Sequence, residues 1–182
     1  MARSRVPFVA CILTLVVTLA PSVARAQGQP LTLLGFHTMA PDNWVPREPS
    51  SSARLAQFVV PGPDSASDAE VVVFYFGGMS GGNVEANLER WREQFTTPEG
   101  GPSYEKVTRD SSGAFPITIA DYQGTYRRGI GMGSADSVRT GQMLVAAIAE
   151  TPKGTLFIQL FGPVATVEAE RARLVKFVDA LK

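Results

Sequence analysis

An unbroken apolar run, Val71 to Phe76 (VVVFYF), places the strongest constraint on how this chain can fold. β-Branched and aromatic residues with no polar residue between them are typical of a strand that is covered on both faces of its sheet. The segments 142–150 and 155–161 have the same character, and the turn sequence at 151–154 predicts that they form a hairpin. A sheet with several such strands needs a layer of structure on each side.

Two segments have the apolar spacing of amphipathic helices that can supply those layers. The first, residues 84–95, has one apolar face, and Asn83 before it is a suitable N-cap because its side chain can accept a bond from a free backbone N–H. The second is predicted to begin at Thr166, with acidic residues near its start and lysines near its end, as the helix dipole favours. The apolar face of the first helix consists of Val84, Leu88, Trp91 and Phe95.

Shorter runs predict the remaining strands. These lie at 31–38, 53–60, 104–109 and 115–126, with Gly124 marking a bulge or bend in the last of them. Hairpin connections dominate the order, so the sheet is expected to be mainly antiparallel. The sequence therefore predicts an α+β fold in which two helices cover a sheet of about six or seven strands, one on each face (an α/β/α sandwich).

The N-terminus has the pattern of an export signal. Arg3 and Arg5 precede an uncharged apolar run from Phe8 to Ala20, and the sequence Ala-Arg-Ala at 24–26 follows. A positive start, a short apolar stretch and an A-x-A site are typical of a secretory signal peptide, and the run is short for a membrane span. We expect residues 1–26 to be removed and residues 27–182 to form a single exported domain, periplasmic or extracellular, with membrane contact only if the signal stays uncleaved.

Composition excludes several classes of protein. Apolar residues make up 45% and charged residues 19%, which is typical of a globular chain, and the 17 basic and 17 acidic residues give no basic excess for nucleic-acid binding. Cys11 and His37 are the one cysteine and the one histidine. A Cys/His zinc site and an intrachain disulfide are therefore excluded, and we expect neither metal nor cofactor.

The glycine-rich segment 77–83 is the main candidate for chemistry. Gly78 to Gly82 matches the pattern GxSxG between a strand and a helix, which suggests a nucleophilic Ser80. That hydrolase type needs a histidine downstream of its serine, whereas His37 lies upstream. Glycines before a helix can also expose N–H groups to an anion, although the segment matches neither a Walker loop nor GxGxxG.

A small basic cluster follows the predicted strand 115–126. Arg127 and Arg128 precede a glycine-rich stretch that extends to residue 141 and has no clear period, so it is predicted to be a loop. The candidate binding residues are Gly81, Gly82, Asn83, Arg127 and Arg128. No residue is assigned a catalytic role.

Three motifs together carry a resemblance to known proteins. They are the turn Ala40-Pro41-Asp42-Asn43-Trp44, the segment from Phe76 to Phe95 with the pattern GG-N-x-x-x-N-x-x-R-W-x-x-Q-F, and Gly124-Thr125-Tyr126. The chain resembles a group of small exported bacterial proteins, mostly uncharacterised, that carry this pattern. More remotely, its strand order and Pro-x-x-Trp turn are similar to the sandwich of the photosystem II extrinsic protein PsbP and the Ran-binding protein Mog1. This resemblance implies a binding or assembly role rather than catalysis.

Three functions follow in order. The first is an exported, non-enzymatic binding or assembly module of the bacterial envelope, whose partner is another envelope protein rather than a nucleic acid. The second is a carrier of a small ligand or anion at the turn 77–83, which needs an enclosed pocket there. The third is a serine hydrolase that uses Ser80, which needs a base within hydrogen-bond reach.

Overall fold

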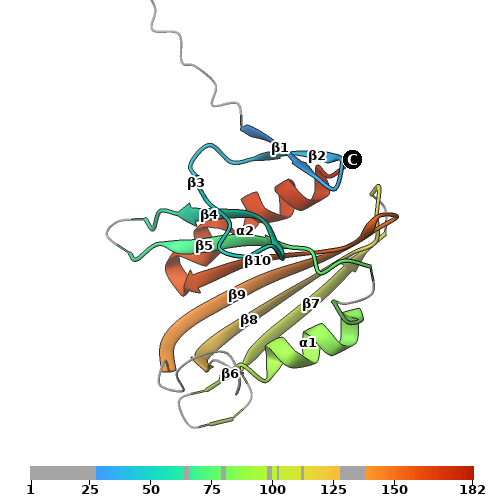
Figure 1. Cartoon of the computed structure of the whole chain (residues 1–182). Coiled ribbons are helices and arrows are strands. Elements are labelled where there is room, and N and C mark those ends of the chain that lie inside the picture. The colour runs from blue at the N-terminus through green and yellow to red at the C-terminus, as the bar shows by residue number, and fades with distance from the viewer. Residues whose placement is uncertain are drawn as a thin grey trace, which may run out of the picture.

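The computed structural model describes residues 28–63, 66–78, 81–97, 100–101, 103–111, 113–127 and 138–182. Its main sheet has eight strands, and every neighbouring pair is antiparallel (Figure 1). In spatial order they are β3 (Val45–Arg47), β4 (Arg54–Val60), β5 (Ala69–Phe74), β10 (Gly154–Pro163), β9 (Val138–Thr151), β8 (Ile117–Arg127) and β6 (Phe95–Thr96), with β7 (Tyr104–Asp110) also on the outer side of β8. A separate hairpin of β1 (Gln29–Leu33) and β2 (Phe36–Ala40) precedes them.

The two helices cover opposite faces of this sheet. Alternate side chains of β9 divide between two cores, because successive residues of a strand point to opposite faces. Val145 and Ala147 pack with α2 (Val164–Asp179), whereas Ala146 and Ile148 pack with α1 (Val84–Arg92). We call these faces of the sheet the α2 face and the α1 face. The predicted α+β fold, with a mainly antiparallel sheet and a helix on each side, is confirmed.

The β1–β2 hairpin completes the layer on the α2 face. Thr38 on β2 donates its hydroxyl to the carbonyl of Phe177 at 2.6 Å, and the backbones of His37 and Lys182 exchange two hydrogen bonds. Leu33 and Ala40 are buried in the same core as α2. The hairpin therefore lies beside the C-terminal end of α2 (Figure 1).

Trp44, in the turn between β2 and β3, is fully buried beneath this layer. Its ring lies 5.7 Å from that of Phe58 and 5.4 Å from that of Phe177, centroid to centroid. Its indole N–H donates to Glu170 Oε2 at 3.0 Å, and Asn43 Nδ2 donates to Oε1 of the same carboxylate at 2.9 Å. The Pro-x-x-Trp turn thus joins the start of the domain to α2.

Three sequence predictions about individual elements were wrong. The predicted strand 31–38 is a hairpin, since Leu34 and Gly35 take positive φ angles of 52° and 84° and turn the chain. Thr166 is not a cap, because α2 begins at Val164 and the buried Thr166 hydroxyl donates to the carbonyl of Ser67 at 2.7 Å. Phe95 belongs to β6, since α1 ends at Arg92.

Other local predictions are confirmed. Asn83 is the N-cap of α1, with φ −81° and ψ 170°. The pairing of β8 with β9 shifts register between Gly124 and Tyr126, so Gly124 does mark a bulge. Residues 152–153 turn the predicted hairpin of β9 and β10.

Candidate binding surface

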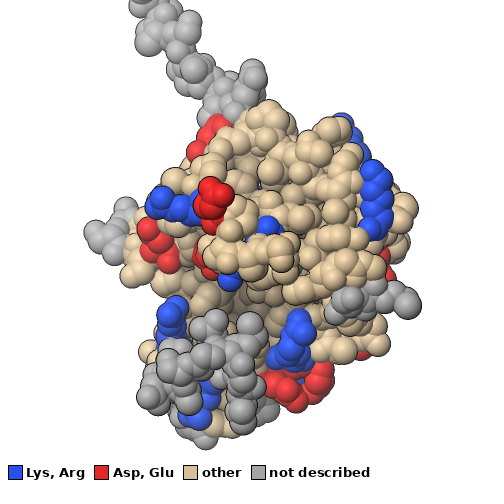
Figure 2. Space-filling view, in the orientation of Figure 1, with Lys and Arg blue, Asp and Glu red and all other residues tan. Residues whose placement is uncertain are grey.

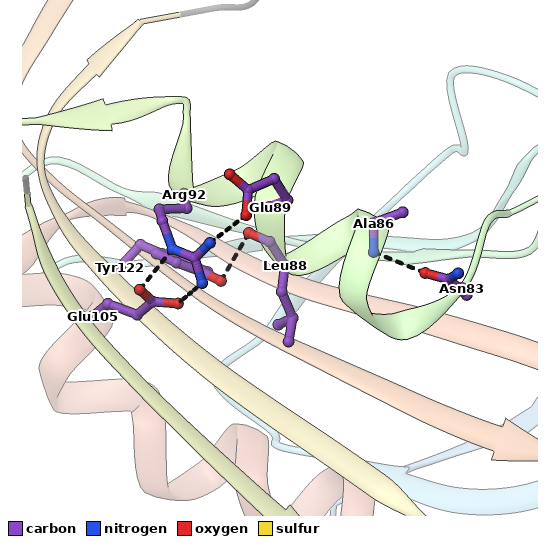
Figure 3. A network of polar contacts seen from close by, with 7 residues as sticks. All are labelled: Asn83, Ala86, Leu88, Glu89, Arg92, Glu105 and Tyr122. Atoms are coloured by element: carbon purple, nitrogen blue, oxygen red, sulfur yellow. Dashed lines mark hydrogen bonds and ion pairs between the residues drawn. The ribbon is translucent and has the colours of Figure 1, made fainter.

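The glycine turn before α1 is held by the side chains of two asparagines. Asn83 Oδ1 accepts the backbone N–H of Ala86 at 2.8 Å (Figure 3). Asn87 is fully buried and donates Nδ2 to the carbonyls of Gly81, at 2.9 Å, and Asn83, at 2.8 Å. Arg90 donates to Asn87 Oδ1. The asparagines of the GG-N-x-x-x-N-x-x-R pattern therefore bond to backbone groups of the glycine turn and of the start of α1, and the arginine bonds to the second asparagine. These roles are structural.

The two glycines of that pattern are required for different reasons. A Cβ on Gly81 would lie 2.5 Å from Cε2 and 2.8 Å from Cζ of Phe157, so a larger residue does not fit there. Gly82 has a φ of +76°, which L-residues adopt at a cost. The turn thus brings α1 close to β10 and directs its apolar side onto the sheet.

A polar network holds the exposed side of α1 to the sheet (Figure 3). Arg92 donates to both carboxylate oxygens of Glu105 on β7, at 2.7 and 2.8 Å, and also pairs with Glu89. Tyr122 on β8 is buried and donates its hydroxyl to the carbonyl of Leu88 at 3.0 Å.

The charges in this network are matched to their surroundings. The hydrogen bond between Glu105 and Arg92 raises the pKa of the guanidinium and lowers the pKa of the carboxyl, and burial raises the pKa of the Tyr122 phenol. Each shift favours the form that the group already has near neutral pH. The network is therefore suited to fixing α1 in place rather than to moving protons.

The predicted binding residues lie at opposite ends of α1. Gly81, Gly82 and Asn83 precede the helix, whereas the backbone N–H of Arg127 donates at 2.8 Å to the carbonyl of Gln94, just after the helix ends. The Arg127 side chain is exposed. Arg128, Ser80, the predicted signal 1–26 and residues 128–137 of the predicted loop lie outside the described residues. The loop was predicted too long, because its described residues belong to β8, which ends at Arg127, and to β9, which begins at Val138.

His37 is engaged within the β1–β2 hairpin. Its Nδ1 lies 3.1 Å from the hydroxyl of Thr32 on β1, directly across the hairpin. The ring is exposed. His37 therefore has a local role, in which its side chain links the two strands of the hairpin.

A depression of about 310 Å³ lies beside the glycine turn. The described residues that line it are Phe76, Gly78, Gly81, Gly82, Asn83, Thr155 and Phe157, and none of them is charged. Phe76 is 42% exposed, so the depression opens to solvent beside this ring. The backbone N–H of Ala86 already donates to Asn83 Oδ1, so the N-terminus of α1 has one fewer free N–H group for an anion.

A second feature is the part of the α1 face that α1 leaves uncovered. Nine-residue α1 packs on β8 and on the core beneath it, and no other described helix lies on this face. Figure 2 shows the surface hollowed between the β3–β5 side and α1. Strand register brings together here the side chains of Val45, Arg47, Gln57, Val59, Glu70, Val72, Phe74, Gln159 and Phe161, which we call the open half-face. Val72 is buried among its neighbours, and the other eight are partly or fully exposed.

Aromatic rings lie at both ends of the open half-face. At one end Phe74 and Phe76 are stacked, with centroids 5.8 Å apart, and Phe76 also contacts Phe157. At the other end Phe161 contacts Tyr126 at 4.6 Å between centroids. Residues 157 and 161 are four positions apart on β10, so the two ends are separated by about 13 Å.

Polar groups occupy the middle of this surface. Gln57 Nε2 donates to Glu70 Oε1 at 2.6 Å, and Arg54 lies 3.5 Å from the same oxygen while its guanidinium sits over the ring of Phe74. Gln159 lies between Phe157 and Phe161 on the same face. Apolar ends with amide groups between them are suited to a segment of protein chain, which has apolar side chains and a polar backbone.

Sequence reasoning missed the open half-face. Its strands looked apolar on both sides, which predicted full coverage by the two helices. Gln57 and Gln159 were the available signal, because each is a polar residue inside an otherwise apolar strand.

Two further observations concern the described residues. No described helix is both long and apolar enough to cross a membrane. Within the described ranges, the side chains that ligate metals do not gather in groups of three or more.

Comparison with known proteins identifies the fold. No family model and no curated protein matches the chain. Among solved structures, PsbP (CyanoP) from Synechocystis sp. PCC 6803 is similar with a TM-score of 0.52 and 11% identity, over 91% of this chain and 98% of that one. A Pseudomonas aeruginosa protein of unknown function, PA94, aligns with a TM-score of 0.49 and 16% identity, over 86% of this chain and 96% of that one.

The comparison with CyanoP defines a class by its fold. The chain has a PsbP-like α+β fold, as its remote resemblance predicted. At 11% identity, the likeness establishes the architecture and nothing about the ligand.

Proposed function

We propose that this protein is a non-enzymatic binding or assembly module of the bacterial envelope, and that its open half-face holds an apolar segment of another envelope protein. The observation that carries the proposal is a partly exposed sheet surface with aromatic rings at both ends and with two glutamine amides and the Arg54–Glu70 pair between them. Apolar surface left uncovered in this way is typical of an interaction site. The PsbP-like fold supports the proposal by analogy.

The other two functions have less support. A carrier needs an enclosed pocket at the turn 77–83, whereas the depression there is open beside Phe76 and the N-cap already uses one of the donors. A hydrolase needs a base for Ser80, and the ring of His37 is bonded to Thr32 instead. The hydrolase has no positive support from these contacts.

Phe76→Ser tests the surface. We expect it to weaken binding of the native partner at least tenfold, since aromatic side chains that become buried in an interface are among those that contribute most to its affinity. The partner is first captured by a photo-crosslinking residue at position 76 in the native envelope. Its affinity for purified variants is then measured by calorimetry.

Met39→Ser is the matched control. Met39 is 45% exposed, close to the 42% of Phe76, but it lies on β2 beside the α2 layer. We expect it to leave the affinity unchanged. Equal losses in the two variants, or none in either, would contradict the proposed surface.

Export is the second part of the proposal. The charged start, the apolar run and the A-x-A site predict that the mature chain begins at Gln27. Intact mass of the protein recovered from the envelope fraction measures this directly. A mass that includes residues 1–26 would show that the segment is retained as an anchor.

A further inference from the structure

Strand β7 lies at the edge of the sheet that the structure describes. It pairs with β8 over seven consecutive residues without a register shift, and no described strand pairs with its other side. It has no proline, and its residues Lys106, Thr108 and Arg109 are exposed. Such an edge presents unpaired N–H and C=O groups and can accept a further strand.

The opposite edge of the sheet is protected. It is formed by β3, which has three residues, one of which is Pro46. Proline lacks an N–H group, and very short strands are a usual means of preventing edge pairing. The contrast marks β7 as the edge that is available for pairing.

The sequence of β7, Tyr-Glu-Lys-Val-Thr-Arg-Asp, is complementary to itself in the antiparallel direction. A two-fold axis at Val107 places Glu105 of one copy opposite Arg109 of the other, twice. Opposite residues of an antiparallel pair point to the same face, and opposite charges there are favourable. With the axis at Lys106 instead, two lysines would meet.

Helix α1 extends this charge pattern. Arg109 already binds Glu85 of α1 at 2.7 Å, and Glu105 binds Arg92 of the same helix. In the symmetric pair, each arginine of β7 lies between two carboxylates, and each glutamate lies between two guanidinium groups. Alternating charges across the junction are therefore continuous from one α1 to the other.

We propose that β7 pairs with β7 of a second copy of this chain, with the two-fold axis at Val107, so that two sheets join into one. The axis is perpendicular to the sheet, as in other isologous pairs of antiparallel edge strands. It places both open half-faces on the same side of the dimer. The proposal depends on β7 alone and is independent of the proposed function.

Thr108 provides a matched pair of tests, because it lies opposite Lys106 of the other copy in this register. Its side chain is exposed, so substitution leaves the fold intact, which a thermal melt checks. Thr108→Glu creates two attractive pairs with Lys106, whereas Thr108→Lys creates two repulsive pairs. Sedimentation equilibrium should show a dimer whose dissociation constant falls in the first variant and rises about tenfold in the second.

Two results would overturn the proposal. One is a chain that stays monomeric up to about 1 mM, where even a weak pair would assemble. The other is a dimer that responds equally to Thr108→Glu and Thr108→Lys, because an interface elsewhere or another register would not distinguish the two charges as predicted.

A cysteine test fixes the register. In a Cys11→Ser background, Val107→Cys places two thiols across the axis, where Cα atoms of an antiparallel pair lie about 4.5–5.5 Å apart, and these should oxidise to a disulfide. Thr108→Cys offsets the thiols by two residues, about 7 Å along the strands, which is too far to bridge. A dimer that crosslinks equally through both positions, or not through 107, contradicts the register.

Discussion

Trp44→Ala should lower the free energy of unfolding by about 3–5 kcal/mol, the usual cost of removing a buried tryptophan side chain. The indole fills the space between Phe58 and Phe177 and is fully buried. Its loss also leaves Glu170, which is buried, without the N–H that bonds its Oε2. Urea denaturation followed by circular dichroism measures the change.

Trp44→Phe separates packing from hydrogen bonding. It keeps an aromatic ring in the core but removes the indole donor, so we expect a loss of about 1–3 kcal/mol. The same change in a Glu170→Ala background should cost less, because the acceptor is already gone. If Trp44→Phe costs the same in both backgrounds, the bond to Glu170 does not couple the turn to α2.

Gly81→Val should be the second most damaging change, with a loss of about 1–3 kcal/mol from overpacking. The new side chain would collide with the ring of Phe157, which is itself buried, and α1 would be displaced from β10. Thermal and urea melts of the purified variant measure the effect.

Alanine variants of three further glycines distinguish the cost of a steric clash from the cost of an unfavourable backbone conformation. Gly77 has a φ of +74° with open space around it, so Gly77→Ala should cost about 1 kcal/mol from backbone strain alone. In Gly82→Ala the alanine would have to adopt a φ of +76°, and its Cβ would lie 3.3 Å from Asn87 Nδ2. Gly113→Ala meets neither strain nor a neighbour and should be neutral. A Gly81→Val variant as stable as Gly113→Ala would contradict the close packing of α1 on β10.

The long elements could be predicted from the sequence because each has a strong local signal. Val71 to Phe76 and the β9–β10 hairpin are apolar on both faces, and that predicts a layer on each side of the sheet, although it does not give the extent of either layer. The short strands β3 and β6 have three and two residues, too few for a period, so they were missed. The burial of Trp44 has no local signal in the sequence because it depends on contacts with α2, more than 120 residues away.

The candidate surface could not be predicted, since it depends on how far α1 extends over the sheet. Hydrophobic periodicity gave the apolar side of α1 but not its position across eight strands. The glycines of the turn 77–83 made it the main candidate for chemistry, whereas in the structure Gly81 and Gly82 allow α1 to pack on the sheet. Arg127 and the turn are neighbours of the same helix, but its length separates them.

Amide hydrogen exchange with the captured partner bound tests the central claim most directly. The account predicts new protection on β4, β5 and β10 around Val59, Val72 and Gln159, with or without protection at Gly81 to Asn83, which lie beside Phe76. Protection confined to the turn before α1, with the open half-face unchanged, would contradict it and favour the carrier.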